Sequence, residues 1–198
     1  MPGLNVLKKV FGFTLIEVLV IILIVGTLSA IAIPSFISLF DKFNINTAVI
    51  EVRAVLQQGQ RQAILKSQVC RVGLNTLDRT VLSYCSSDER KLPDKVAFAT
   101  NIVKFSTLPK ELVTIEFGVL GTAKFAVEDL DENGAYNQVV NPPKDPSGKI
   151  VFYIASNSNL SKKCIAISNT LGLTRVGNYT GKIIGNSKLS NKGVCTAA

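Results

Sequence analysis

The residue types that most often carry out enzymatic chemistry are scarce in this chain. Its 198 residues include no His and no Trp. Without His, the chain lacks the commonest general base and the commonest metal ligand, and its Ser and Cys residues cannot form a His-dependent triad. The adjacent acids Asp88–Glu89 and Asp131–Glu132 are typical of solvated surface rather than of an acid–base dyad. The composition therefore predicts a protein that is not an enzyme.

Glu17 is the one acid in an unusual setting, because it lies near the start of an apolar run that ends at Ile33. From Val18 onward only three small residues interrupt the aliphatic side chains. As a helix, the segment Phe13–Ile33 would be about 30 Å long, which matches the hydrocarbon core of a bilayer. An ionised carboxylate costs roughly 2.5–3.5 kcal/mol in that environment, so we expect Glu17 to have a partner and a function.

The four cysteines fall into two local pairs, Cys70 with Cys85 and Cys164 with Cys195. None has the C-x-x-C spacing of zinc or thioredoxin-like sites. An even number of cysteines behind a membrane-targeting segment indicates two disulfides formed in an oxidising compartment. Of the three pairings we expect the local one, because each pair would then join neighbouring strands. Four buried thiols are the alternative.

Positive charge is concentrated near the C-terminus. The formal net charge is +8, and residues 149–198 carry no acid and seven basic residues: Lys149, Lys162, Lys163, Arg175, Lys182, Lys188 and Lys192. This asymmetry permits contact with a polyanion, a membrane surface or an acidic partner.

The segment Asp129–Gly134 has the pattern of the first half of a calcium loop. Asp129, Asp131 and Asn133 would supply oxygen ligands at alternate positions, and the glycine would allow a sharp turn. The twelfth position is Val140, where a bidentate glutamate is expected. We favour the alternative, an acidic hairpin turn with Asn-Gly at its tip.

These residues must be positioned by a long helix and a set of short strands. Beyond the apolar run, helical spacing of apolar residues predicts an amphipathic helix that ends near Ser67, with a core stripe of Ile45, Val49, Val52, Leu56 and Ala63. Gly59 costs about 1 kcal/mol relative to alanine in a helix, and it would allow close packing against a sheet.

From Val69 the pattern changes to alternation and turns. Val69–Leu74 and Thr80–Cys85 predict an antiparallel hairpin. Further strands are expected at Lys95–Ala99, Leu112–Phe117, Ala123–Val127, Ile150–Ile154, Cys164–Ser168 and Arg175–Tyr179. A helix followed by many short strands predicts an α+β fold, with an antiparallel sheet packed on the C-terminal half of the helix.

The sequence Lys8-Lys9-Val10-Phe11-Gly12, followed by Phe13-Thr14-Leu15-Ile16-Glu17, resembles the class III signal of type IV pilins and type II secretion pseudopilins. The resemblance implies that a prepilin peptidase cuts after Gly12 and methylates Phe13, and that the helix stays in the mature protein. Glu17 would then pair with the terminal amine of a neighbouring subunit, and Pro34 matches the helix-kinking proline of the family. A plain signal anchor is the alternative.

A looser resemblance covers the head. Gln57–Ile64 and Cys164–Gly172 are similar to minor pseudopilins of the GspH and FimT type. Some FimT-type proteins bind DNA through a Gly-Arg-x-Arg motif, and some pilin relatives bind calcium in the head. Here the matching place reads Gly172-Leu173-Thr174-Arg175, with one arginine, to which Lys162, Lys163 and Lys182 would add phosphate contacts. Tyr179 is the only aromatic residue nearby for base stacking, so we favour a solvated surface.

The sequence thus predicts four segments: a leader at 1–12, a transmembrane and filament-core helix at 13–34, its amphipathic continuation at 35–67 and a β-rich head at 68–198. We expect a single-pass inner-membrane protein with a periplasmic head, which later joins a pilus or pseudopilus. The expected partners are prepilin peptidase and other pilins, and no cofactor is expected unless calcium binds. The alternatives are a pilus-associated DNA receptor and a membrane-anchored periplasmic binding protein.

Overall fold

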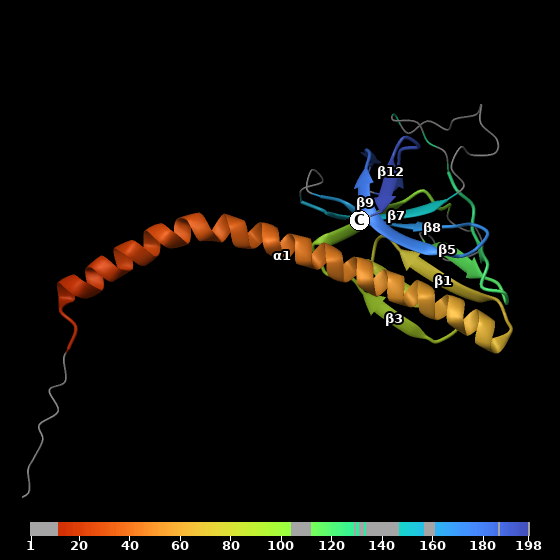
Figure 1. Cartoon of the computed structure of the whole chain (residues 1–198), viewed down its shortest axis with the longest axis horizontal. Coiled ribbons are helices and arrows are strands. Elements are labelled where there is room, and N and C mark those ends of the chain that lie inside the picture. The colour runs from red at the N-terminus through yellow and green to blue at the C-terminus, as the bar shows by residue number, and fades with distance from the viewer. Residues whose placement is uncertain are drawn as a thin grey trace, which may run out of the picture. The chain divides into compact units, whose positions relative to one another are not determined.

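The computed structural model describes residues 12–103, 112–128, 130, 133, 147–156, 161–185 and 187–197, except for the side chains of Ile31, Ala32 and Pro34. Helix α1 (Leu15–Lys66) precedes all the described strands. The chain divides into two compact units, Met1–Phe40 and Asp41–Ala198. The second unit, called the head below, therefore contains the last part of α1 and both sheets (Figure 1).

The first sheet of the head has five strands, and every neighbouring pair is antiparallel. Their order is β3 (Asp88–Lys91), β2 (Thr80–Ser83), β1 (Cys70–Asn75), β5 (Leu112–Phe117) and β6 (Ala123–Lys124). Val72 pairs with Ser83 and Asn75 with Thr80 in the β1–β2 hairpin. The hairpin predicted from the alternation of Val69–Leu74 and Thr80–Cys85 is thus confirmed.

The second sheet has seven strands and is antiparallel except where β11 meets β4. Their order is β10 (Ile183–Ile184), β11 (Lys188–Leu189), β4 (Val96–Thr100), β7 (Gly148–Ile154), β8 (Lys163–Ile167), β9 (Thr174–Thr180) and β12 (Val194–Ala197). Strand β7 lies at the centre, and all seven of its residues are buried, so this sheet is covered on both faces.

One hydrophobic core joins α1 to both sheets. The helix contributes a stripe of buried residues at spacings of three, four and seven: Ile45, Ala48, Val49, Val52, Val55, Leu56 and Ala63. Phe117 from the first sheet and Phe98 and Phe152 from the second are almost fully buried in the same core. Burying each such side chain contributes roughly 1.5–3 kcal/mol, so this stripe holds the two sheets together.

The strands differ from the prediction in their number and grouping. The α+β class is confirmed, but the strands form two sheets rather than one. The sequence did not predict β3, β10, β11 or β12. Strand β3 reads Asp-Glu-Arg-Lys, which has no apolar alternation, and it depends on pairing with β2 and on an ion pair. There Arg90 Nη1 lies 2.5 Å from Glu51 Oε2 of α1, and this hydrogen bond raises the pKa of the guanidinium.

Gly59 confirms the prediction of close packing between helix and sheet. A Cβ at this position would lie 2.6 Å from Val72 Cγ2 and 3.5 Å from Phe117 Cδ2. Both side chains are fully buried and have no room to move.

We therefore expect Gly59→Ala to lower the free energy of unfolding by about 1–3 kcal/mol, because overpacking outweighs the gain in helix propensity. Urea unfolding of the detergent-solubilised chain measures this change. The matched control is the double variant Gly59→Ala/Val72→Ala, in which the added methyl group takes up freed space. A coupling energy near zero between the two substitutions would contradict the proposed contact.

Candidate functional site

The N-terminus of α1 is capped by the residues that surround Glu17. The backbone N–H of Glu17 donates to the Thr14 hydroxyl at 3.3 Å and to the Thr14 carbonyl at 3.1 Å. Thr14 and Glu17 thus occupy the first and last positions of a capping box, and the carboxylate lies in the first turn, where the helix dipole favours negative charge. The Glu17 side chain makes no hydrogen bond or ion pair with the described residues, so it is available to a partner.

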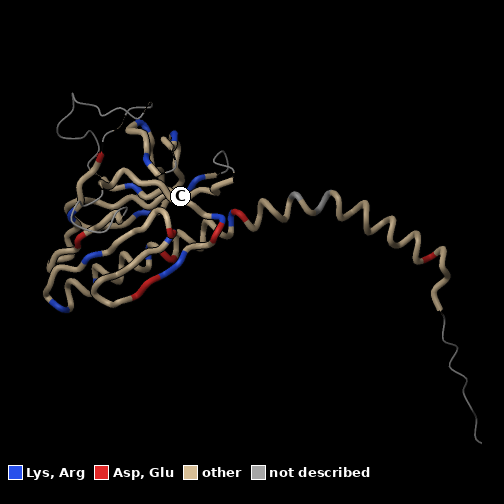
Figure 2. Tube along the Cα trace, turned by 180° about the vertical axis from the view of Figure 1, so that it is seen from behind, with Lys and Arg blue, Asp and Glu red and all other residues tan. Residues whose placement is uncertain are grey.

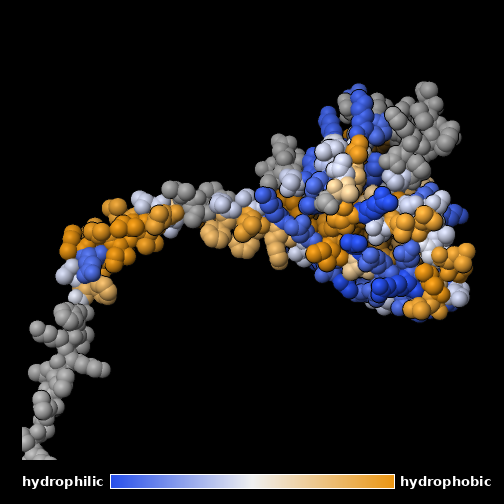
Figure 3. Space-filling view, viewed as in Figure 1, coloured by the Kyte–Doolittle hydropathy of each residue, from blue (hydrophilic) through white to orange (hydrophobic). Residues whose placement is uncertain are grey.

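The first part of α1 exposes an apolar surface on every side. Phe13 is 74% exposed, and the large apolar residues that follow it are 45–83% exposed: Leu15, Ile16, Val18, Leu19, Val20, Ile21, Ile22, Leu23, Ile24, Val25, Leu28 and Ile33. Figure 3 shows orange side chains over much of the visible face of this segment. A helix that is apolar all round must be buried in lipid or against other chains, so this segment requires an apolar environment from outside the chain.

The polar residues of this segment are satisfied within the helix. The Thr27 hydroxyl donates to the Ile24 carbonyl at 2.9 Å, and the Ser29 hydroxyl donates to the Val25 carbonyl at 2.7 Å. Neither hydroxyl therefore needs water, which makes the segment compatible with an apolar environment. Among its described side chains, Glu17 carries the only formal charge.

By length and composition, no single straight helix among the described residues qualifies as a membrane span. Leu15–Ala30 and Ser35–Lys66 qualify only together, as a pair bent by 45°. Pro34 falls between these segments in the sequence, although its side chain lies outside the described part, so its role in the bend stays a prediction. Residues 1–11, which belong to the expected leader and include Lys8 and Lys9, also lie outside the described residues.

The head contains two disulfides with the local pairing expected from the sequence. Cys70 bonds to Cys85, with Cα atoms 5.6 Å apart, and Cys164 bonds to Cys195, with Cα atoms 6.0 Å apart. The first ties β1 to the segment that follows β2. The second ties β8 to β12 across β9, the strand that lies between them.

This crossing requires a glycine on β9. A Cβ at Gly177 would overlap the carbonyl oxygen of Thr196, so the backbone of the paired strand β12 leaves no room for a side chain at that point. The close approach was not predicted, although a glycine inside a strand pattern is a recognised signal of it. Buried Lys149 also helps to hold this segment, because its Nζ donates to the Gly193 carbonyl at 2.8 Å.

The four cations considered for DNA binding are not gathered in one place. Lys162 and Lys182 line one hollow, and Lys163 lines a second beside α1 with Lys42. Arg175 lies further along the β8–β9 ladder, opposite Ala166, in a third hollow. The distribution of charge over the head is visible in Figure 2. These four residues therefore line three separate hollows, and their proposed DNA binding stays a prediction.

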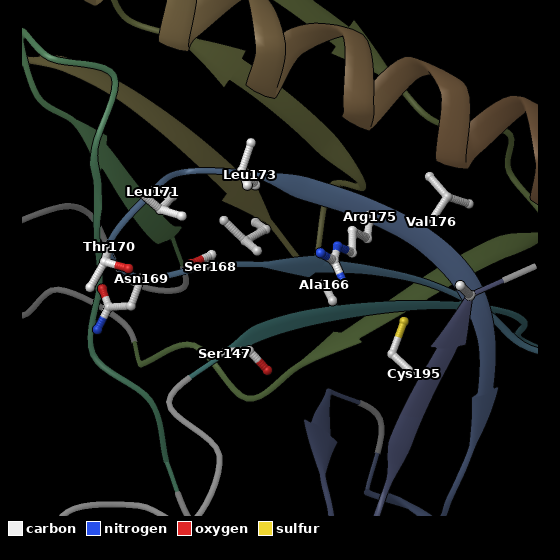
Figure 4. A pocket seen from close by; sticks show the side chains of 12 residues that line it. Ser147, Ala166, Ser168, Asn169, Thr170, Leu171, Leu173, Arg175, Val176 and Cys195 are labelled. Carbon is white, nitrogen blue, oxygen red and sulfur yellow. The ribbon is translucent and has the colours of Figure 1, made fainter.

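The hollow at Arg175 has a volume of about 540 Å³ and lies at the β8–β9 turn. Figure 4 shows the Arg175 guanidinium pointing toward the space between Ala166 and Ser168, with Leu171 and Leu173 on the turn above it. Arg175 is exposed, and among the described residues it is the only charged one that lines this hollow. One cation among mostly apolar and hydroxyl groups does not provide the run of phosphate contacts that DNA binding needs.

The proposed calcium ligands cannot be located, because Asp129 and Asp131 lie outside the described residues; only Asn133 of the three is described, in a turn. In the described part of the chain, no group of three or more acidic or cysteine residues is placed to hold a metal ion.

Tyr179 is a buried phenol without a partner in the described part of the head. Its side chain is 5% exposed, and its hydroxyl has no hydrogen bond there. Gly181 and Gly193 leave room for the ring, which packs against the disulfide region. Burial raises the pKa of Tyr179 to about 12 from its ordinary value of 10.0.

Comparison with known proteins identifies the N-terminal segment. Residues 7–33 match the family model described as the prokaryotic N-terminal methylation motif. A solved structure titled as the minor pseudopilin EpsH from the type 2 secretion system of Vibrio cholerae aligns with a TM-score of 0.42 and 9% identity, over 66% of this chain and 96% of that one. No curated protein matches the sequence.

The methylation motif spans the capped start of α1 and the exposed apolar segment, and an antiparallel head follows it. The chain therefore carries a prokaryotic N-terminal methylation motif at the start of its long helix.

We expect Tyr179→Phe to leave the free energy of unfolding at neutral pH nearly unchanged, because no hydrogen bond within the described head is lost. In the parent protein, the Tyr179 phenol has a pKa of about 10 in the unfolded chain and about 12 in the folded head. The contribution of this phenol to the free energy of unfolding is therefore fully present below pH 10, and it is lost as the pH rises from about 10 to about 12. The variant should lose less stability than the parent between neutral pH and about pH 11 in urea unfolding.

The control is Tyr84→Phe, because Tyr84 is 45% exposed. An equal pH response in parent and Tyr179→Phe would show that this phenol ionises freely in the folded head.

Proposed function

We propose that the protein is a minor pilin or pseudopilin of the GspH and FimT type, a structural subunit that does no chemistry of its own. In this proposal it is made as a precursor and held in the inner membrane by the first part of α1, with the head in the periplasm. It is then assembled into a type IV pilus or a type II secretion pseudopilus. The observation that carries the proposal is the methylation motif on an exposed apolar helix that carries one unpaired carboxylate.

The assembly step follows from the electrostatics of Glu17. Cleavage after Gly12 would create a terminal amine on Phe13, which carries a positive charge at neutral pH even when it is methylated. When the apolar segment leaves lipid and packs among other subunits, an unpaired Glu17 would be a buried charge. The terminal amine of a neighbouring subunit neutralises that charge, and the pairing sets the axial register between subunits.

The two head segments that resemble GspH and FimT proteins lie near each other in the fold. Gln60, from the first segment, donates through Nε2 to the Gly121 carbonyl at 2.7 Å. Gly172, from the second segment, packs so closely that a Cβ there would lie 2.8 Å from the same Gln60 nitrogen. This contact supports the subtype, because the similar residues act together to position the β8–β9 turn.

Processing can be tested by mass spectrometry of the chain purified from cells that contain a prepilin peptidase. We expect the mature protein to begin with N-methylated Phe13, and we expect Gly12→Leu to leave the leader attached, because a large side chain would not fit a site that selects glycine. Gly26→Ala is the matched control, since a Cβ at Gly26 meets no atom within 4 Å. Recovery of wild-type chain with its leader intact would contradict the proposed processing.

Assembly can be tested with Glu17→Ala. We expect this variant to stay in the membrane fraction but to be lost from sheared filaments, because breaking a buried ion pair costs about 3–5 kcal/mol. Glu17→Asp should restore part of the incorporation, since it keeps the charge. Thr27→Val is the control, because the Thr27 hydroxyl bonds only within its own helix. Normal incorporation of Glu17→Ala would overturn the assembly role.

A further inference from the structure

The hollow of the head that Lys162 and Lys182 line is distinct from the hollow at Arg175. It has a volume of about 620 Å³ and is lined by the β1–β2 turn, by β4 and β7, and by the segment around β10. Its lining includes three cations, Arg79, Lys162 and Lys182, and no acid among the residues that the structure describes. We call it the cationic groove.

Two of these cations are free to bind a ligand. The side chains of Arg79 and Lys182 make no hydrogen bond or ion pair with the residues that the structure describes, whereas Lys162 Nζ donates to the Gly181 carbonyl at 3.1 Å. Three like charges around one hollow repel each other, and a bound anion would relieve this repulsion. The positive charge of the groove is therefore complementary to the negative charge of an acidic ligand.

Apolar side chains lie beside these charges. Leu77 is 68% exposed at the rim, and Ile183 is half-buried. The two aromatic rings that line the groove, Tyr153 and Phe98, are 6% and 1% exposed. They are too deeply buried to stack with a base, so the groove lacks the aromatic platform of single-strand nucleic-acid sites. Exposed apolar contact beside cations fits a peptide with both acidic and aliphatic side chains.

The β1–β2 turn holds its side of the groove in a fixed shape. The Asn75 side-chain oxygen accepts the backbone N–H groups of Leu77 and Asp78 at 3.0 and 3.2 Å. Arg79 has a φ of 55°, a strained value for a non-glycine residue, and its carbonyl accepts the Leu92 N–H at 2.9 Å. A turn held in this way loses little freedom on binding, which favours affinity.

We propose that the cationic groove binds an acidic segment of a partner protein, with carboxylates facing Arg79 and Lys182 and an aliphatic side chain against Leu77 and Ile183. This interaction goes beyond filament assembly. It concerns the surface of the head and does not depend on Glu17 or on processing after Gly12.

The test uses the full chain in detergent and a fluorescein-labelled peptide of alternating glutamate and leucine, with fluorescence anisotropy as the readout. We expect saturable binding that weakens as salt increases, and about a tenfold loss of affinity in Arg79→Gln/Lys182→Gln. The matched control is Arg61→Gln/Lys124→Gln, which removes the same charge from exposed positions outside the groove and should bind like the parent. The single variant Lys182→Gln keeps the test valid if the Arg79 substitution disturbs the turn.

Three results would overturn the proposal. Equal losses in the groove and control pairs would mean that only net charge matters. Equal binding of a glutamine–leucine peptide would show that carboxylates are not recognised. Failure of the peptide to bind, together with groove-dependent binding of duplex DNA, would assign the groove to nucleic acid instead.

Discussion

The buried stripe of α1 is the interaction on which the head depends. Val52 and Leu56 are fully buried, and the core that they join includes residues from both sheets. Neither sheet could bury its inner face without another element packed against it, and the helix is the element that packs against both. Gly59 lets this helix approach β1, and Glu51 links it to β3 through Arg90.

The first part of α1 differs from the last part in the environment that its surface needs. There the large apolar side chains are exposed, and the hydroxyls of Thr27 and Ser29 bond to their own helix. A surface of this kind is stable in lipid or within a bundle of identical helices. One charged group, Glu17, has no partner among the described residues. In the proposed assembly, its charge would have to be neutralised when the helix leaves lipid.

In the proposed filament, the choice of partner subunits must come from the head, because an apolar helix packs with little selectivity. Strand β12 is held beside β9 by the disulfide between Cys164 and Cys195 and by the close backbone contact at Gly177. The hydrogen bonds of Asn75 hold the β1–β2 turn. Arg175 lines one hollow of the head, and Lys162 and Lys182 line another.

The sequence by itself determined the features that depend on local pattern. These include the apolar helix with Glu17, the amphipathic stripe beyond it and the β1–β2 hairpin, since each follows from residue spacing within one segment. Tertiary structure alone decided the division into two sheets and the addition of β3 and β12. It also separated the basic residues and brought Arg79 beside Lys162 and Lys182. The physical reason is that these features depend on contacts between segments that are distant in the sequence. In addition, a polar strand such as Asp88–Lys91 lacks the apolar alternation from which a strand is predicted.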